Sequence, residues 1–302
     1  MAEANTHYYA TRDPFGPAGD FITAPEISQM FGELVGAALA DVWLRAGAPD
    51  DAVFAELGPG RGTLAADALR VMRSGGFVGA VHFVETSPIL RAAQRERVPA
   101  ARWHETIEEL PPQPLLLIAN EFFDALPVRQ WVGGEERKVM IKDGLLAFTA
   151  DGEVREESPA RSAAVLALAA HLTTHGGAAL IIDYGYLAGV GDTLQAVRAH
   201  RFADVLAKPG EQDITAHVDF TAVTRAGEAA NATVSPVVSQ GTWLERLGIS
   251  ARAMALAAGS PAHIEEIAVA RRRLCGEAEM GELFKVIAIH APGWPEPAGF
   301  RG

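Results

Sequence analysis

Short apolar segments of strand length alternate with helical patterns along most of the chain, and this alternation limits the fold more than any other feature. Segments such as Leu115–Ala119 and Ala178–Ile182 are far too short to span a membrane and are apolar on both faces, as strands buried on two sides are. The expected core strands are Val53–Leu57, Ala80–Glu85, Ala101–Trp103, Leu115–Ala119, Ala178–Asp183, Thr233–Val238 and Leu283–Ile289. The pattern predicts a mostly parallel sheet with helices on both faces.

Helical periodicity and cap residues occupy the intervals between these strands. We expect helices from Pro25 to Gly47 and over 63–74, 88–97, 159–175, 219–231, 242–247 and 260–275. Between Arg129 and Thr149, apolar and polar residues alternate around Gly-Gly and Asp-Gly pairs, which predicts an antiparallel hairpin insertion. Residues 184–218 read as a long loop, and the proline-rich tail 291–302 as poorly ordered.

The expected organisation is one core domain with additions. An N-terminal segment, 1–47, is turn-rich over 13–21 and then helical, and is expected to pack on the core. The core itself covers 48–290, with insertions at 128–157 and 184–232, and the tail covers 291–302.

Composition excludes several classes of protein. The 302 residues include 38 acidic and 26 basic side chains, a formal net charge of −12, which argues against a general nucleic-acid binder. A single cysteine, Cys275, excludes an internal disulfide framework. No signal peptide or membrane span is expected, so we expect a cytoplasmic protein. No metal site is predicted, because His171-x-x-x-His175 lies alone on an Ala/Leu-rich helix.

The strongest local motif is a glycine-rich turn between the first expected strand and the next helix. Its spacing is G-x-G-x-G, at Gly58, Gly60 and Gly62, instead of the G-x-G-x-x-G of dinucleotide-binding folds. Glu56 stands two residues earlier, and a carboxylate there suits a ligand with an ammonium or sulfonium group better than a pyrophosphate. The spacing therefore favours S-adenosylmethionine (SAM) over NAD. A tight turn without any ligand is the alternative.

Polar residues at the ends of the second and third strands extend this candidate cofactor site. Glu85 ends the second strand, where doubly wound folds hydrogen-bond the ribose, and Thr86 follows it. His104 and Glu105 end the third strand, where adenine contacts are expected, although both could be surface loop residues.

The fourth and fifth strands end in residues suited to the reacting edge. Asn120, Glu121 and Asp124 follow the fourth strand, and we expect Asn120 to contact the cofactor and the two acids to act in catalysis. Asp124 could instead cap the next helix. Asp183 ends the fifth strand and is the next candidate for catalysis, where it would contact the acceptor, although it could instead brace a loop. Tyr184 and His217 are as well explained by packing and loop order.

With these residues in view, the chain resembles the MidA family of class I SAM-dependent methyltransferases over nearly its whole length. The blocks that carry the resemblance are Gly19–Gly36 (GDFITAPEISQMFGELVG), Glu56–Leu64, Val84–Leu90, Asn120–Pro127 (NEFFDALP), Asp183–Gly185, Gly191–Leu194, Asp213–Phe220 (DITAHVDF) and Met280–Val286. Relatives usually carry a further helical segment before the tyrosine pair that Tyr8-Tyr9 matches, and MAEANTH stands there in this chain.

The resemblance implies an α/β fold, namely a doubly wound, mostly parallel, seven-stranded Rossmann-like sheet that binds SAM. The family includes a mitochondrial arginine N-methyltransferase that acts on a subunit of respiratory complex I. It therefore implies a protein acceptor bearing arginine, such as a complex I subunit, and a homodimer is left open. The alternatives are a small-molecule methyltransferase, a non-catalytic assembly or chaperone module on the same fold and, more distantly, an NAD dehydrogenase. A hydrolase lacks its nucleophile elbow.

Overall fold

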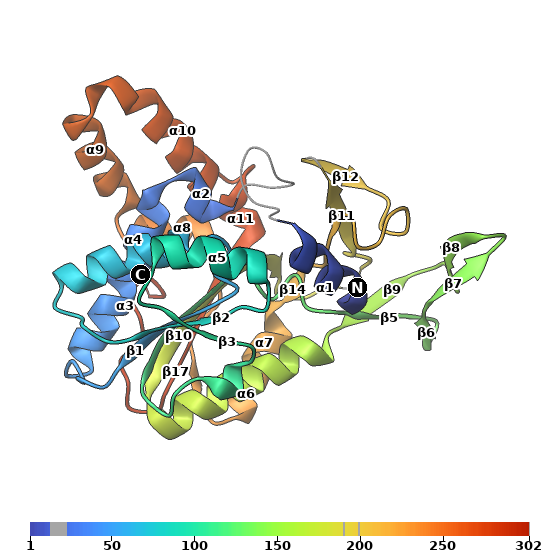
Figure 1. Ribbon diagram of the computed structural model, residues 1–302, viewed down its shortest axis with the longest axis horizontal. Coiled ribbons are helices and arrows are strands. Elements are labelled where there is room, and N and C mark those ends of the chain that lie inside the picture. The colour runs from blue at the N-terminus through green and yellow to red at the C-terminus, as the bar shows by residue number, and fades with distance from the viewer. Residues whose placement is uncertain (13–22, 190, 199, 302) are drawn as a thin grey trace.

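The computed structural model describes residues 1–12, 23–189, 191–198 and 200–301, and the turns expected within 13–22 lie outside this range. Its centre is a sheet in the order β15-β17-β10-β4-β1-β2-β3 (Figure 1). The strands are β1 (Val53–Leu57), β2 (Val81–Val84), β3 (Arg102–His104), β4 (Leu115–Asn120), β10 (Gly177–Tyr186), β15 (Thr233–Val234) and β17 (Phe284–His290). The mostly parallel seven-stranded sheet is confirmed along this path.

Parallel pairing brings the functional strand ends to one edge. β1 pairs in parallel with β2 and β4, β4 with β10, and β2 with β3, whereas β17 runs antiparallel to β10. Two further short strands lie beside this path: β14 (Val218–Asp219) pairs with β10, and β16 (Val238–Ser239) pairs with β17. The carboxyl ends of β1, β2, β4 and β10 therefore meet on the same side of the molecule, where open α/β sheets bind ligands.

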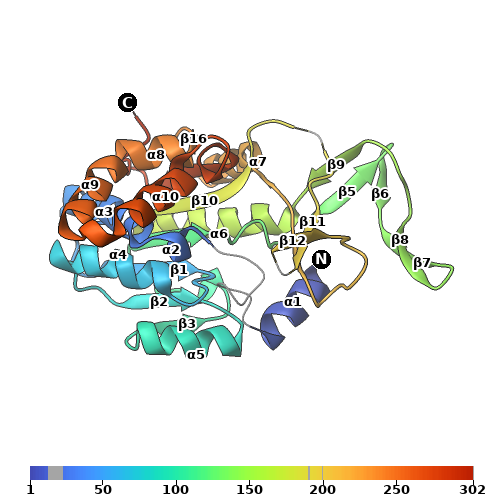
Figure 2. The same cartoon turned by 90° about the horizontal axis from the view of Figure 1, so that it is seen from above.

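Helices cover both faces of the sheet (Figures 1 and 2). One face packs on α3 (Gln29–Arg45), α4 (Thr63–Ser74), α5 (Pro88–Arg97) and α8 (Gln240–Arg246), and the other on α6 (Pro159–His175) and α7 (Phe220–Ala229). Strand alternation supplies both layers, because Phe54 belongs to the first apolar cluster and its neighbours Val53 and Ala55 to the second.

Capping residues explain why several helices begin where the sequence predicts. Ser87 accepts a hydrogen bond from the amide of Leu90 and is followed by Pro88, so α5 begins there. Ser158 accepts one from the amide of Arg161 in the same way at the start of α6. In both cases a serine oxygen satisfies an amide that the first helical turn leaves unpaired, and the proline has no amide to satisfy.

Other elements differ from the expected ones. The helix expected from Pro25 divides at Ser28 into α2 (Ala24–Ile27) and α3, because Ser28 is extended and its side chain caps α3 through Met30. The helix expected over 260–275 is a 3-10 turn, η2 (Pro261–His263), followed by α10 (Ile264–Cys275), and it is preceded by α9 (Ile249–Gly259), which the sequence analysis missed. The single strand expected over 233–238 is divided into two short strands, β15 and β16, each of which pairs with β17.

Three further helical elements lie outside the layers described above. They are the 3-10 turn η1 (Ile107–Glu109) and the helices α1 (Ala2–Thr11) and α11 (Met280–Leu283).

Both insertions are antiparallel. The first, as predicted, is an arm that extends away from the body (Figures 1 and 2), built from β5 (Arg129–Val132), β6 (Glu135–Arg137), β7 (Val139–Lys142), β8 (Leu145–Phe148) and β9 (Val154–Glu157). The second was expected to be a long loop, but it contains a three-stranded sheet of β11 (Gln195–Arg198), β12 (Arg201–Ala203) and β13 (Asp213–Thr215). Its strands are too short to produce a clear alternation in the sequence.

The expectation of a poorly ordered tail is wrong. Phe300 is only 3% exposed, and the indole of Trp243 donates a hydrogen bond to the carbonyl of Ala298. Arg246 reaches the carbonyls of Gly299 and Phe300 from the same helix. The prolines keep the tail out of regular structure, but tertiary contacts hold it against α8.

Among the described residues, no helix is long and apolar enough to cross a membrane.

A tight contact between α3 and α4 gives a test of this packing. A Cβ atom added at Gly36 would lie 2.6 Å from the Cα of Ala68, so Gly36→Ala should lower the free energy of unfolding by about 1–3 kcal/mol through overpacking. Gly259→Ala, at the end of α9, has open space around it and should be neutral or slightly stabilising. Urea unfolding of both variants measures this, and equal stabilities would contradict the packing.

Candidate functional site

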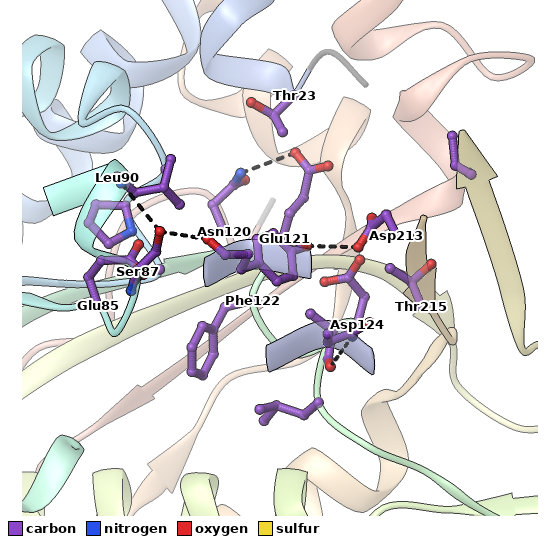
Figure 3. A pocket seen from close by; sticks show the side chains of 18 of the residues that line it. Thr23, Glu85, Ser87, Leu90, Asn120, Glu121, Phe122, Asp124, Asp213 and Thr215 are labelled. Carbon is purple, nitrogen blue, oxygen red and sulfur yellow. Dashed lines mark hydrogen bonds between the residues drawn. The ribbon is translucent and has the colours of Figure 1, made fainter. Parts of the chain in front are cut away.

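A cavity of about 800 Å³ lies at the carboxyl edge of the sheet. The turns after β1, β2 and β4 form its floor, and α1, β11 and β13 contribute to its walls. Figure 3 shows Glu85, Ser87 and Leu90 toward one end of it and Asp124, Asp213 and Thr215 toward the other, with Asn120 and Glu121 between them.

The glycine turn forms part of the first end. Gly58, Gly60 and Gly62 all have positive φ values, +60°, +53° and +78°, which L-residues with a side chain rarely adopt. Gly58 also lies against Phe122, since an added Cβ would be 2.9 Å from its ring. The turn therefore needs glycine for its backbone shape and presents bare backbone to the cavity.

Glu56 lies at the end of β1, is only 3% exposed and lines the cavity. The nearby amide of Ala65 opposes the effect of burial on its pKa, while its Oε2 atom has no hydrogen-bond partner among the described residues. Burial raises the pKa of Glu56 to about 8. A buried acid with an unpartnered oxygen in a cavity is suited to a donor or cation supplied by a ligand.

Glu85 is held rigidly at the end of β2. Its Oε1 accepts from the amide of Ser87 at 2.8 Å and its Oε2 from the side-chain amide of Gln94 at 3.2 Å. Burial raises the pKa of this carboxyl, and the hydrogen bond from Ser87 opposes that rise. Thr86 is exposed beside it and also lines the cavity.

Asn120 and Glu121 occupy the middle of the floor, at the end of β4. Asn120 donates to Glu121 Oε1 at 3.2 Å, and its own Oδ1 is buried without a partner among the described residues. The backbone of Glu121 has a φ of +50°, a strained value for this residue and of a kind that clusters at functional sites. Burial first, and then the nearby Asp124, raise the pKa of Glu121 to about 8.

Asp124 and Asp183 have different positions although both were candidates for catalysis. Asp124 lines the cavity, accepts from the hydroxyl of Tyr184 at 2.5 Å, and leaves Oδ1 without a partner among the described residues. Asp183 is fully buried below the cavity wall, and its Oδ2 accepts from the amides of Phe123 and Asp124 at 3.0 and 3.1 Å. Asp183 therefore braces the loop that carries the other acids.

The structure does not bring two expected adenine contacts into the cavity. His104 stacks on His82, with 2.8 Å between Nε2 and Nδ1, and Glu105 is exposed; neither lines the cavity. His217 does line it, with its ring edge against Tyr184, and burial lowers its pKa.

Sequence reasoning missed two walls of the cavity. Asn5 and Tyr9 of α1 line it, and so do Asp213 and Thr215 of β13. The tyrosine pair and the DITAHVDF block were recognised as family features, which is the signal that could have found them. No periodicity in either segment indicates that it lies over the sheet edge.

Comparisons with known proteins agree with this geometry. A family model described as an S-adenosyl-L-methionine-dependent methyltransferase matches residues 34–238. The chain belongs to this family of SAM-dependent methyltransferases. The expected resemblance, enzyme class and cofactor are thereby confirmed.

Three relatives illustrate the match. The mitochondrial protein arginine methyltransferase NDUFAF7 homolog of Drosophila melanogaster is 37% identical over 339 residues, covering 93% of this chain and 77% of that protein. The Homo sapiens protein arginine methyltransferase NDUFAF7 is 32% identical, covering 93% and 76%. A Burkholderia thailandensis structure bound to S-adenosyl-homocysteine superposes with a TM-score of 0.85 at 30% identity, covering 99% of this chain and 88% of that one.

These relatives also correct one expectation. The Drosophila melanogaster and Homo sapiens relatives are both named as mitochondrial proteins, which contradicts the cytoplasmic location expected from the sequence. The expectation was based on finding no signal peptide and no membrane span in the sequence, and neither observation distinguishes the cytoplasm from a mitochondrial compartment.

The raised pKa of Glu56 leads to a test by pH. An acid with a pKa near 8 in the folded protein and near 4.5 when unfolded takes up a proton on folding at a pH between these values, so stability falls as pH rises from about 5 to about 8. Glu56→Gln should flatten this slope by up to about 1.4 kcal/mol per pH unit. Urea unfolding from pH 5 to 8 measures it, with the exposed Glu135→Gln as control. A slope equal to that of the control would contradict a protonated Glu56.

Proposed function

We propose that this SAM-dependent methyltransferase acts on the guanidinium group of an arginine in a protein. We call the end of the cavity at the glycine turn and Glu85 the near end, and the end at Asp124 the far end. The observation that supports the proposal most is at the far end, where Glu121 and Asp124 lie close together and Asp124 keeps a buried oxygen without a partner among the described residues. Such a site has a deficit of positive charge that a cationic acceptor would fill. The printed names of the relatives, protein arginine methyltransferases, support the same acceptor.

The near end suits the cofactor. We assign to it Gly58 and Gly60 of the glycine turn, together with Glu56, Glu85, Thr86 and Asn120, all of which line the cavity. Gly62 does not line it and contributes only its positive φ to the shape of the turn. The unpartnered oxygen of Glu56 and the bare glycine backbone fit a ligand with a cationic group and an extended chain. When bound, SAM supplies a methyl group that is already activated by its sulfonium. His104 and Glu105 are left out of this assignment because they do not line the cavity.

The acids at the far end would orient the acceptor. A guanidinium keeps its charge in water because its pKa exceeds ~12, so carboxylates are needed to hold its N–H groups and localise the charge away from the reacting nitrogen. That nitrogen would take the methyl group of the bound cofactor, which leaves as the neutral thioether S-adenosyl-homocysteine. The nitrogen would lose one proton, which we assign to Glu121 in the ionised form that pairing with a guanidinium favours. Catalysis of this kind depends mostly on positioning, and Asp183 would contribute by holding the loop.

The partner remains open at a finer level. On the strength of the resemblance we propose a subunit of respiratory complex I as the acceptor and a homodimer as the assembly. A labelling assay distinguishes the acceptor classes: the protein and methyl-labelled SAM are incubated with an extract of source cells that lack this enzyme. We expect label in methylated arginine after hydrolysis of the precipitated protein. Label confined to the small-molecule fraction, or none at all, would exclude the proposal in favour of one of the two alternatives.

Replacement of Glu121 tests the catalytic end. Glu121→Gln keeps the size and the neutral character of the protonated acid, so SAM affinity in calorimetry should stay within about twofold. Methyl transfer should fall by on the order of 100-fold, because glutamine cannot ionise and so cannot pair with the guanidinium or take its proton. Glu135→Gln on the arm is the matched control. Undiminished transfer in the Glu121 variant would show that this acid has no catalytic part.

Replacement of Glu85 tests the cofactor end. Glu85→Gln should weaken SAM binding by about 10-fold, since a hydrogen bond to a charged acceptor is worth about 1.5–3 kcal/mol. The measurement is calorimetry with SAM and with S-adenosyl-homocysteine, and Glu105→Gln serves as control because Glu105 does not line the cavity. If the Glu105 variant is affected and the Glu85 variant is not, the assignment is reversed.

A further inference from the structure

We propose that Asp213 is a third carboxylate of the acceptor pocket, and that Tyr9 of the N-terminal helix orients it so that the pocket selects a guanidinium. The inference rests on the proposed function and adds to it a specificity-determining residue and a positioning residue. Both come from segments outside the sheet that carries the glycine turn and the other acids.

The position of Asp213 follows from strand geometry. In β13, Asp213 and Thr215 both line the cavity, as expected for alternate residues on one face of a strand. Their register partners on β11, Val197 and Gln195, line it as well. One face of this small sheet is therefore a wall of the cavity, and Asp213 is its acidic residue.

Tyr9 holds this carboxylate in place. Its hydroxyl donates to Asp213 Oδ1 at 2.8 Å, while its backbone carbonyl accepts from the hydroxyl of Ser87 at 2.7 Å. Ser87 in turn donates its amide to Glu85, the acid of the cofactor end. The helix is anchored independently by Asn5, whose side-chain amide donates to the carbonyls of two segments at 3.0 and 2.8 Å.

A second acid at the same end of the cavity is also bound by a tyrosine. Asp124 also has one oxygen bound by a tyrosine hydroxyl, that of Tyr184, and its other oxygen is buried without a partner among the described residues. Asp124 and Asp213 are close enough that both raise the pKa of Tyr9 and both raise that of Glu121. Among the described residues that line the cavity, the one lysine or arginine is Arg61, in the glycine turn at the other end.

This geometry matches a guanidinium better than an ammonium. A guanidinium is planar and presents five N–H donors along three sides, so it is best held by carboxylates on different walls. Glu121 and Asp124 come from the loop after β4, whereas Asp213 comes from β13. An ammonium is a compact charge that one or two carboxylates satisfy, and a neutral urea group has no charge to pair.

Binding of small acceptor analogues tests the inference. The protein is loaded with S-adenosyl-homocysteine and titrated in a calorimeter with N-acetyl-arginine amide, N-acetyl-lysine amide and N-acetyl-citrulline amide. We expect the arginine compound to bind best. Asp213→Asn should weaken it at least 10-fold but the citrulline compound less than twofold, and Tyr9→Phe should weaken the arginine compound about threefold. Affinity for S-adenosyl-homocysteine should not change in either variant.

The control is Asp204→Asn, which removes one charge from the same insertion at an exposed position away from the cavity. If the unaltered protein does not prefer arginine to citrulline, the proposed function itself fails. If it does, but Asp213→Asn behaves like Asp204→Asn, only the present inference is overturned. A merely structural role would weaken all three analogues alike, which also overturns it. Should Asp213→Asn not fold, Tyr9→Phe decides by the same ratio of affinities.

Discussion

Two buried side chains hold the loop on which the rest of the site depends. Asp183 accepts hydrogen bonds from the amides of Phe123 and Asp124, and Arg161 donates to the carbonyls of the same two residues. Arg161 also donates to the carbonyls of Ala216 and His217, which follow β13. The loop after β4 and the wall at β13 are thus fixed to one guanidinium on α6, and a buried arginine with its hydrogen bonds satisfied has no low-energy alternative position.

The hydrogen bonds of Asp183 and Arg161 hold the loop after β4, and this loop places acids of the cavity near one another. Glu56 and Glu121 both have pKa values raised to about 8, chiefly by burial, and Asp124 adds to the rise at Glu121. Such groups destabilise the ligand-free protein when they ionise, because charge is removed from water without compensation. A sulfonium at one end and a guanidinium at the other would relieve that cost.

The parts of the fold that local chemistry determines agreed with the sequence analysis. α4, α5 and α6 begin and end at the predicted residues, since the serine caps and prolines of α5 and α6 and the glycine turn before α4 are all local signals. The glycine turn, Glu85 and the NEFFDALP block were likewise placed at strand ends, because apolar strands with a helix between them leave one arrangement of parallel pairing. His104 was expected at the adenine position by analogy with strand order, but its partner is His82 on the neighbouring strand. That contact depends on register, which the spacing alone does not show.

The sequence by itself determined the sheet, its carboxyl edge and the residues that meet there, because a two-sided apolar strand and a capped helix each have one stable way to pack. Only the tertiary structure decided which acids face the cavity. It placed Asp183 outside the cavity and Asp124 and Asp213 in its lining, and it made the N-terminal helix part of a cavity wall. These choices follow from hydrogen bonds between residues as far apart as Tyr9 and Asp213, which satisfy buried polar groups and have no counterpart in local sequence.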